Sequence, residues 1–157
     1  TSEVGKGSTF FFTVAYEPVQ KKDVKLNSTE NRTDNSFNGE EKMILVAEDD
    51  KTSKELLESI LSEDTFKLVY TKNGKETIEM CRKNPDIDMI LMDLKMPFMD
   101  GFEATKILRE FFDKPIIAQT AYALPGDREK AIAAGCTDYI TKPLKSNELL
   151  DMIRKHL

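Results

Sequence analysis

Residues that could carry out chemistry stand within three residues of the ends of the short apolar segments of this sequence. They are the run Glu48-Asp49-Asp50, then Asp93, Thr120 and Lys142. Carboxylates that lie close together raise each other's pKa unless a cation compensates their charge. An oxygen-only set of this kind suits Mg²⁺, which takes one or two carboxylates and keeps several waters. The sequence therefore indicates an acidic pocket that holds a divalent cation.

The same residues could also transfer a phosphoryl group. A carboxylate can act as a nucleophile towards phosphorus. The divalent cation and the Lys142 ammonium would neutralise the phosphoryl oxygens, and the Thr120 hydroxyl would donate a hydrogen bond to one of them. Taken singly, each residue has a structural interpretation, as a helix cap, a loop residue or a Lys-Pro turn. The combination favours a site because each group closes a different predicted strand.

The elements that must position these residues are predicted by the apolar patterns of residues 42–157. Short apolar runs at 43–47, 68–70, 89–92, 116–118 and 139–140 predict strands. The uninterrupted run at 43–47 is typical of a parallel strand that is covered on both faces. The first predicted helix carries Leu56, Leu57, Ile60 and Leu61, and the next two start near Gly74 and near Gly101. A fourth helix ends at Gly135, and Ser146 is predicted to cap the fifth.

Five βα units of this kind imply an α/β fold with a doubly wound parallel sheet and right-handed crossovers. Ligands of such sheets bind at the carboxyl ends of the strands, where the strand order reverses. Two of the three acidic residues in the run Glu48-Asp49-Asp50 should therefore meet Asp93 in one crevice.

The first forty residues have a different composition. Residues 27–41 contain Phe37 as the single large apolar residue, so residues 17–41 are predicted to be a linker. Residues 8–16 are β-branched and aromatic and follow a Gly5-Lys6-Gly7 turn, which predicts a strand. Residues 1–16 are therefore predicted to be the C-terminal remnant of another domain. A phosphate-binding loop is disfavoured there because Gly-Lys-Ser/Thr after a four-residue spacer is missing.

Composition excludes several other classes of protein. With 39% hydrophobic and 32% charged residues and a formal net charge of -5, the chain is not expected to bind nucleic acid through a basic surface. It has no apolar run long enough to span a membrane and no signal peptide, so a cytoplasmic location is expected. His156 is the sole histidine, which excludes His-rich metal sites and Ser-His or Cys-His catalysis. Cys81 and Cys136 lack CxxC spacing and are given no function.

Four motifs in residues 42–157 resemble the receiver domain of two-component response regulators. They are Ile44-Leu45-Val46-Ala47-Glu48-Asp49-Asp50, Met92-Asp93-Leu94-Lys95-Met96-Pro97-Phe98-Met99-Asp100-Gly101, Gln119-Thr120-Ala121 and Thr141-Lys142-Pro143. The resemblance implies a flavodoxin-like (βα)5 fold with strand order 2-1-3-4-5. It also implies that this part of the chain is a phosphoacceptor module of a phosphorelay.

The resemblance implies roles for the site residues as well. Asp93 would be phosphorylated. Mg²⁺ would be bound by Asp49, Asp93 and the main-chain carbonyl of Lys95, and through water by Glu48, where the family usually has Asp. A cis Lys142-Pro143 bond would aim the ammonium into the pocket.

The signalling residues follow from the same resemblance. Thr120 would move towards the phosphoryl group, and Tyr139 would turn inward as an aromatic switch, although a half-buried Tyr139 that does not move is the alternative. Lys95 and Tyr122 border the pocket and would tune hydrolysis. The readout would lie on the fourth helix, fifth strand and fifth helix.

Residues 2–14 resemble the final hairpin of a histidine-kinase ATP-binding domain, which suggests a fragment of a hybrid sensor kinase. A free-standing regulator with an incidental leader is the alternative. The donor would be a phosphohistidine supplied in trans, because His156 near the end of the last helix is a poor candidate. The acceptor downstream would be a histidine phosphotransfer protein. If the parent kinase is anchored in a membrane, this domain is expected on the cytoplasmic side.

Two other functions differ in class. An aspartyl-phosphate phosphatase typically has an Asp-x-Asp motif, whereas Lys95 lies two residues beyond Asp93. A non-phosphorylated interaction module generally loses an acidic or lysine position, and none is lost here. The fragment is therefore expected to catalyse only its own phosphorylation and dephosphorylation, while the parent would be a protein histidine kinase.

Overall fold

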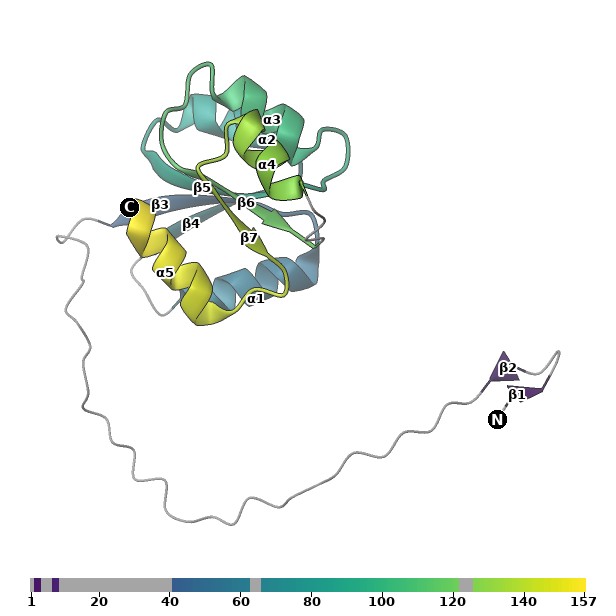
Figure 1. Ribbon diagram of the computed structural model, residues 1–157. Helices are drawn as coiled ribbons and strands as arrows, with labels where there is room; N and C mark the ends of the chain where they lie inside the picture. The colour runs from purple at the N-terminus through teal and green to yellow at the C-terminus, as the bar shows by residue number, and fades with distance from the viewer. Residues whose placement is uncertain (1, 4–6, 9–40, 63–65, 122–125) are drawn as a thin grey trace, which may run out of the picture. The chain divides into compact units, whose positions relative to one another are not determined.

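The computed structural model describes residues 2–3, 7–8, 41–62, 66–121 and 126–157 (Figure 1). The chain divides into two units, Thr1–Asn35 and Ser36–Leu157. In the first unit, β1 (Ser2–Glu3) pairs antiparallel with β2 (Gly7–Ser8). The strand predicted at 8–16 and the linker predicted at 17–41 lie outside the described residues except for Ser8 and Glu41. The domain limits therefore stay predictions.

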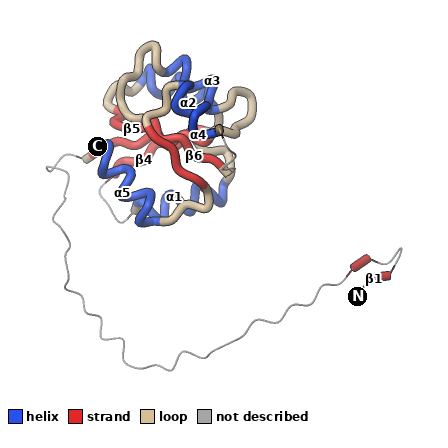
Figure 2. The backbone as a smooth tube through the Cα atoms, in the orientation of Figure 1, coloured by secondary structure: helices blue, strands red, loops and turns tan. Residues whose placement is uncertain are grey.

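The second unit contains a five-stranded parallel sheet with the order β4-β3-β5-β6-β7. Figure 2 shows the strands in red between helices in blue. Its elements are β3 (Lys42–Ala47), α1 (Lys51–Leu61), β4 (Phe66–Thr71), α2 (Gly74–Lys83), β5 (Ile87–Asp93), α3 (Gly101–Leu108), β6 (Ile116–Thr120), α4 (Asp127–Ala134), β7 (Asp138–Thr141) and α5 (Ser146–His156). Numbered within this unit, the strand order is 2-1-3-4-5. The predicted fold class and strand order are confirmed.

Helices cover both faces of this sheet. In Figure 1, α1 and α5 lie on one face and α2, α3 and α4 lie on the other. Side chains along β3 alternate between the two layers, with Ile44 and Val46 packing on the α1–α5 side and Leu45 and Ala47 on the α2–α4 side. All four are completely buried. This burial on both faces explains why the strand reads as an unbroken apolar run.

The ends of the helices are set by short-range hydrogen bonds. Asp50 caps α1 by accepting from the Ser53 amide at 2.7 Å, and Asn73 caps α2. Gly135 ends α4 with a φ of 109°, in the left-handed region that favours glycine, as predicted. The prediction for Ser146 was wrong. Lys145 is the N-cap of α5, without a side-chain capping bond, because its backbone is extended and Ser146 is already the first helical residue.

One residue of the apolar helical pattern is not buried. Leu56 is 43% exposed, whereas Leu57, Ile60 and Leu61 are buried. Since each residue turns about 100° around a helix, Leu56 lies at the edge of the stripe that faces the sheet. The two cysteines are buried, and burial raises the pKa of Cys81 to about 11. None of the described helices is long and apolar enough to cross a membrane.

Asp138 ties the C-terminal turn of α5 to the start of β7. Its carboxylate accepts from Lys155 Nζ at 2.9 Å and lies 3.0 Å from Nε2 of His156, and its other oxygen accepts from the amide of Tyr139 at 2.9 Å. Burial alone would raise the pKa of Asp138, but these hydrogen bonds outweigh it and lower the pKa to about 2. His156 is thus engaged in a structural contact.

This contact predicts a pH-dependent effect of Asp138→Asn. A carboxyl group with a depressed pKa stabilises the fold above its unfolded pKa of about 4. That contribution is lost as the pH falls towards the folded value of about 2. We expect the variant to have a lower urea midpoint than the native chain at pH 7, and the two midpoints to converge between about pH 4 and pH 2. A difference that is constant over this range would contradict the assignment.

Candidate functional site

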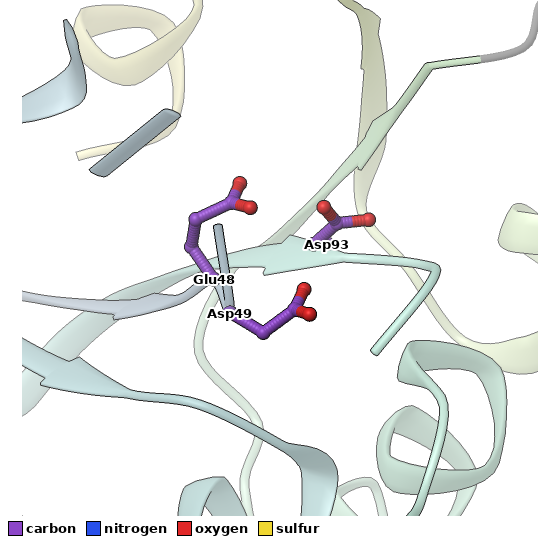
Figure 3. Close-up of side chains that lie close together, drawn as sticks. All are labelled: Glu48, Asp49 and Asp93. Atoms are coloured by element: carbon purple, nitrogen blue, oxygen red, sulfur yellow. The ribbon is translucent and has the colours of Figure 1, made fainter. Parts of the chain in front are cut away.

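Three carboxylates meet at the carboxyl ends of β3 and β5, which are neighbouring strands (Figure 3). Glu48 and Asp49 follow β3, and Asp93 is the last residue of β5. One oxygen from each lies within 4.8 Å of the others. Glu48 and Asp93 are only 3% and 6% exposed, whereas Asp49 is exposed. Asp50 does not join them because its carboxylate caps α1.

Lys142 brings a cation to this acidic pocket from the end of β7. Its Nζ donates to Oδ2 of Asp93 at 2.5 Å and to Oε2 of Glu48 at 2.6 Å. The Lys142-Pro143 peptide bond is cis, as the resemblance implied. Residues from three strands that are far apart in sequence therefore share one cluster of charges.

Both oxygens of each buried carboxylate have partners. The second oxygen of Asp93, Oδ1, accepts from the amide of Lys95 at 2.8 Å. The second oxygen of Glu48, Oε1, accepts from the amide of Asp50 at 3.2 Å. The carboxylate of Asp93 is consequently held by a main-chain donor on one side and by an ammonium on the other.

Burial and charge shift the pKa values of this cluster. Desolvation raises the pKa of Glu48, the hydrogen bond and charge of Lys142 oppose the shift, and the Asp93 charge adds to it. For Lys142, desolvation would lower the pKa, but the bonds to Asp93 and Glu48 outweigh it and raise the pKa above its usual value. Lys142 thus stays charged, and two carboxylates compete for one ammonium.

The remaining predicted residues lie on β6, on β7, just after β5 or outside the described residues. Thr120 ends β6 and is 2% exposed, and its register partner on β7 is Thr141. Tyr139 is half-buried and packs against the layer formed with α2, α3 and α4. The Lys95 side chain is exposed beside Asp93. Tyr122 lies outside the described residues, so its predicted role stays a prediction.

The loop that follows Asp93 is held close to the strand by a glycine. A Cβ atom at Gly101 would lie 2.3 Å from the Asp93 carbonyl oxygen and 2.9 Å from the Leu94 Cα. Phe98, in the same loop, has a φ of 66° and is 87% exposed. The sequence signal for Gly101 was only a helix start, so its contact with the backbone of Asp93 was not predicted.

The donor set of the pocket fits a hard divalent cation. Three carboxylates face one ammonium, which leaves a net negative charge on the cluster. Each of the three acidic residues offers a carboxylate oxygen as a metal ligand. Asp49 is exposed, so the pocket is open to solvent on its side. These properties match the preference of Mg²⁺ for one or two carboxylates together with waters.

The chain resembles proteins of one family in sequence and in structure. Residues 44–154 match the model of the response regulator receiver domain. Over 123 residues the chain is 37% identical to hybrid signal transduction histidine kinase I of Dictyostelium discoideum. The matched segment covers 73% of this chain but only 7% of that much longer protein.

Solved structures agree with the sequence match. The receiver domain of sensor histidine kinase PA1611 from Pseudomonas aeruginosa, with a magnesium ion coordinated in its active site cleft, is 32% identical, with a TM-score of 0.69 and coverage of 74% of this chain and 98% of that one. A chain from the co-crystal structure of the Saccharomyces cerevisiae phosphotransfer protein Ypd1 and the Ssk1 receiver domain is 29% identical, with a TM-score of 0.69 and coverage of 74% and 88%. The family model matches most of the chain, and the acidic residues and the lysine of the chain's motifs lie together in one cluster. This chain therefore belongs to the response regulator receiver domain family.

Proposed function

We propose that Asp93 is the residue of this receiver domain that accepts a phosphoryl group. The observation that carries the proposal is the environment of its carboxylate, which is buried, bonded to the Lys95 amide and to Lys142, and within 4.8 Å of two further acidic side chains. The main-chain bond to Oδ1 fixes the orientation of the group. Oδ2 is the oxygen whose partner, Lys142, can move to an incoming phosphoryl group.

In the proposed reaction, a carboxylate oxygen of Asp93 forms a bond to phosphorus while the bond from phosphorus to the donor histidine nitrogen breaks. The electron pair of that bond stays on the imidazole ring. Lys142 transfers its hydrogen bond from Asp93 to a phosphoryl oxygen, where it stabilises the developing charge. Thr120 donates from its hydroxyl to another phosphoryl oxygen.

Asp49 and Asp93, with the carbonyl of Lys95, are proposed to hold Mg²⁺ in this pocket. A bound Mg²⁺ would neutralise charge on the phosphoryl oxygens and help to orient them. Glu48 is proposed to act through water because its two oxygens already accept from Lys142 and from the Asp50 amide. The family's magnesium-bound relative supports this proposal.

Signal output is proposed to follow from movement of Thr120 towards the phosphoryl group and of Tyr139 into the space that it leaves. Such a switch shifts the population between two arrangements, because new hydrogen bonds to the phosphoryl group favour one of them. Tyr139 is half-buried and lies on β7, the strand that pairs with β6, which ends at Thr120. Lys95 and Tyr122 are proposed to tune the hydrolysis of the phosphorylated form.

The partners and the parent protein are likewise proposed. A phosphohistidine of a kinase would be the donor, and a histidine phosphotransfer protein would be the downstream acceptor, as the co-crystal structure of Ypd1 with the Ssk1 receiver domain suggests. The similarity to a hybrid kinase supports an origin in such a protein, with residues 1–16 as the end of its ATP-binding domain and 17–41 as a linker. The receiver domain, residues 42–157, would then act in the cytoplasm.

The test is phosphorylation of the chain by acetyl phosphate in the presence of Mg²⁺, followed by intact mass spectrometry. We expect one added phosphoryl group on the native chain. No adduct is expected after chelation of the metal or in Asp93→Asn. An adduct that persists in Asp93→Asn would refute the assignment of Asp93, and sustained turnover of a phosphate ester would favour a phosphatase instead.

A further inference from the structure

Gln119 is a buried polar residue that the proposed function has not used. Its side chain is 0% exposed, and neither its amide nitrogen nor its amide oxygen has a hydrogen-bond partner among the described residues. Buried polar groups without partners are rare in native proteins, and each one costs stability. A carboxamide with both atoms unpartnered therefore calls for a physical explanation.

The sheet register locates this carboxamide. Gln119 on β6 is the register partner of Asp93 on β5 and of Ile140 on β7. Register partners in neighbouring parallel strands project from the same face of a sheet, at a strand spacing of about 4.8 Å. Gln119 therefore lies on the same face as Asp93.

That face is the one covered by α1 and α5. Ile117 and Ile140 both pack in the α1–α5 layer, and Ile117 stands two residues before Gln119 on the same strand. Lys142 lies just beyond the end of β7, and its bond to Asp93 brings its ammonium to the same face. Gln119 thus places an amide in an apolar layer, next to the strand ends that carry Asp93 and Lys142.

Lys142 has the complementary hydrogen-bonding capacity. Its ammonium carries three N–H donors, of which two bond to Asp93 and Glu48 in this structure. When Asp93 is phosphorylated, its carboxylate becomes a mixed anhydride, and the oxygen bonded to phosphorus loses its negative charge and becomes a weaker acceptor. The ammonium must then redistribute its donors, and a buried amide oxygen on the same face can accept one of them.

We propose that Gln119 is a positioning residue that holds the Lys142 ammonium in the phosphorylated state. The proposal rests on the proposed function of Asp93 and Lys142. The Gln119 amide lacks partners in the unphosphorylated arrangement, and its oxygen accepts a hydrogen bond from Lys142 when that ammonium turns to the phosphoryl group. Gln119 therefore biases the domain towards the phosphorylated arrangement, at the expense of stability in the unphosphorylated one.

The test compares the native chain with Gln119→Met, which keeps an unbranched side chain of similar size but removes both polar atoms. Beryllium trifluoride with Mg²⁺ serves as a stable analogue of the phosphoryl group. We expect the variant to bind this analogue about tenfold more weakly, the equivalent of one hydrogen bond to a charged group. In the absence of the analogue, we expect its melting temperature to be higher than that of the native chain, because an unpartnered amide has been removed.

A weaker affinity for the analogue together with a higher melting temperature distinguishes a positioning role of Gln119 from a role in core packing alone, for which the melting temperature would fall and the affinity would not change. Ile117→Val is the matched control, because it perturbs the same face of the same strand, and it should lower the melting temperature without changing analogue affinity. Unchanged affinity in Gln119→Met would overturn the proposal. So would a lower melting temperature without the analogue, which would show that the amide already has a partner such as an internal water. Failure of the native chain to bind the analogue would instead count against the proposed function.

Discussion

Replacing Lys142 by alanine is expected to slow the phosphorylation of Asp93 by about 100-fold, in line with the loss of one preorganised charge at a reacting centre. Lys142 is the single cation that the described structure shows bonded to both Asp93 and Glu48. Without it, only the bound Mg²⁺ would compensate the negative charge of the incoming phosphoryl group and of the three carboxylates. The reduced rate would be measured with acetyl phosphate and intact mass spectrometry at saturating Mg²⁺.

The same substitution should have the opposite effect on metal binding. The Lys142 ammonium occupies oxygens of Asp93 and Glu48 and opposes the approach of a second cation. Its removal should therefore increase the affinity for Mg²⁺ several-fold, which calorimetric titration can measure. The unliganded variant should also be less stable by about 3 kcal/mol, since two buried carboxylates lose their partner. Added Mg²⁺ should restore part of this loss.

Lys145→Ala is the matched control, because Lys145 is exposed and its ion pair is with Glu148 on the surface of α5. This control should retain the native phosphorylation rate, Mg²⁺ affinity and stability, the last within about 0.5 kcal/mol. A parallel loss of Mg²⁺ affinity and of rate in Lys142→Ala would contradict the assignment. It would mean that the substitution disrupts the acidic pocket as a whole.

A methyl group added at Gly101 is expected to destabilise the fold by about 3 kcal/mol, at the upper end of the range for overpacking. The new Cβ would lie 2.3 Å from the Asp93 carbonyl oxygen, 2.9 Å from the Leu94 Cα and 3.0 Å from the Met92 Cγ. Two of these atoms belong to the backbone and cannot rotate away. Relief requires that α3 moves away from the end of β5.

This movement should also impair the site. The backbone at Asp93 and Leu94 sets the turn in which the Lys95 amide bonds to the Asp93 carboxylate. We expect Gly101→Ala to lower the urea midpoint and, under conditions where the variant is folded, to slow phosphorylation by about tenfold through misplacement of the nucleophile. Glu103→Ala, an exposed change in the first turn of the same helix, is the control and should alter neither quantity. Native stability in Gly101→Ala would refute the close approach.

Local patterns were sufficient to predict the elements of residues 42–157. The apolar run at 43–47 became β3, the glycine before Cys136 ended α4, and the side chains at the strand ends came together because parallel strands end at one edge. The exact cap of α5 was missed by one residue, because the backbone angles that separate the cap from the first helical residue are not specified by a residue pattern. The strand order was available from the family resemblance and not from periodicity.

Residue types and their spacing therefore specified the kind of fold and the kind of chemistry, since helical period, strand alternation and capping are encoded within a few neighbouring residues. Other features depend on atoms that meet across long sequence separations. The folded chain assigns Asp50 to a helix cap while Glu48 and Asp49 face Asp93, joins Lys142 to two carboxylates, presses Gly101 against the backbone of Asp93 and leaves the Gln119 amide without a described partner. Such outcomes arise from strand register and packing, which no local pattern contains.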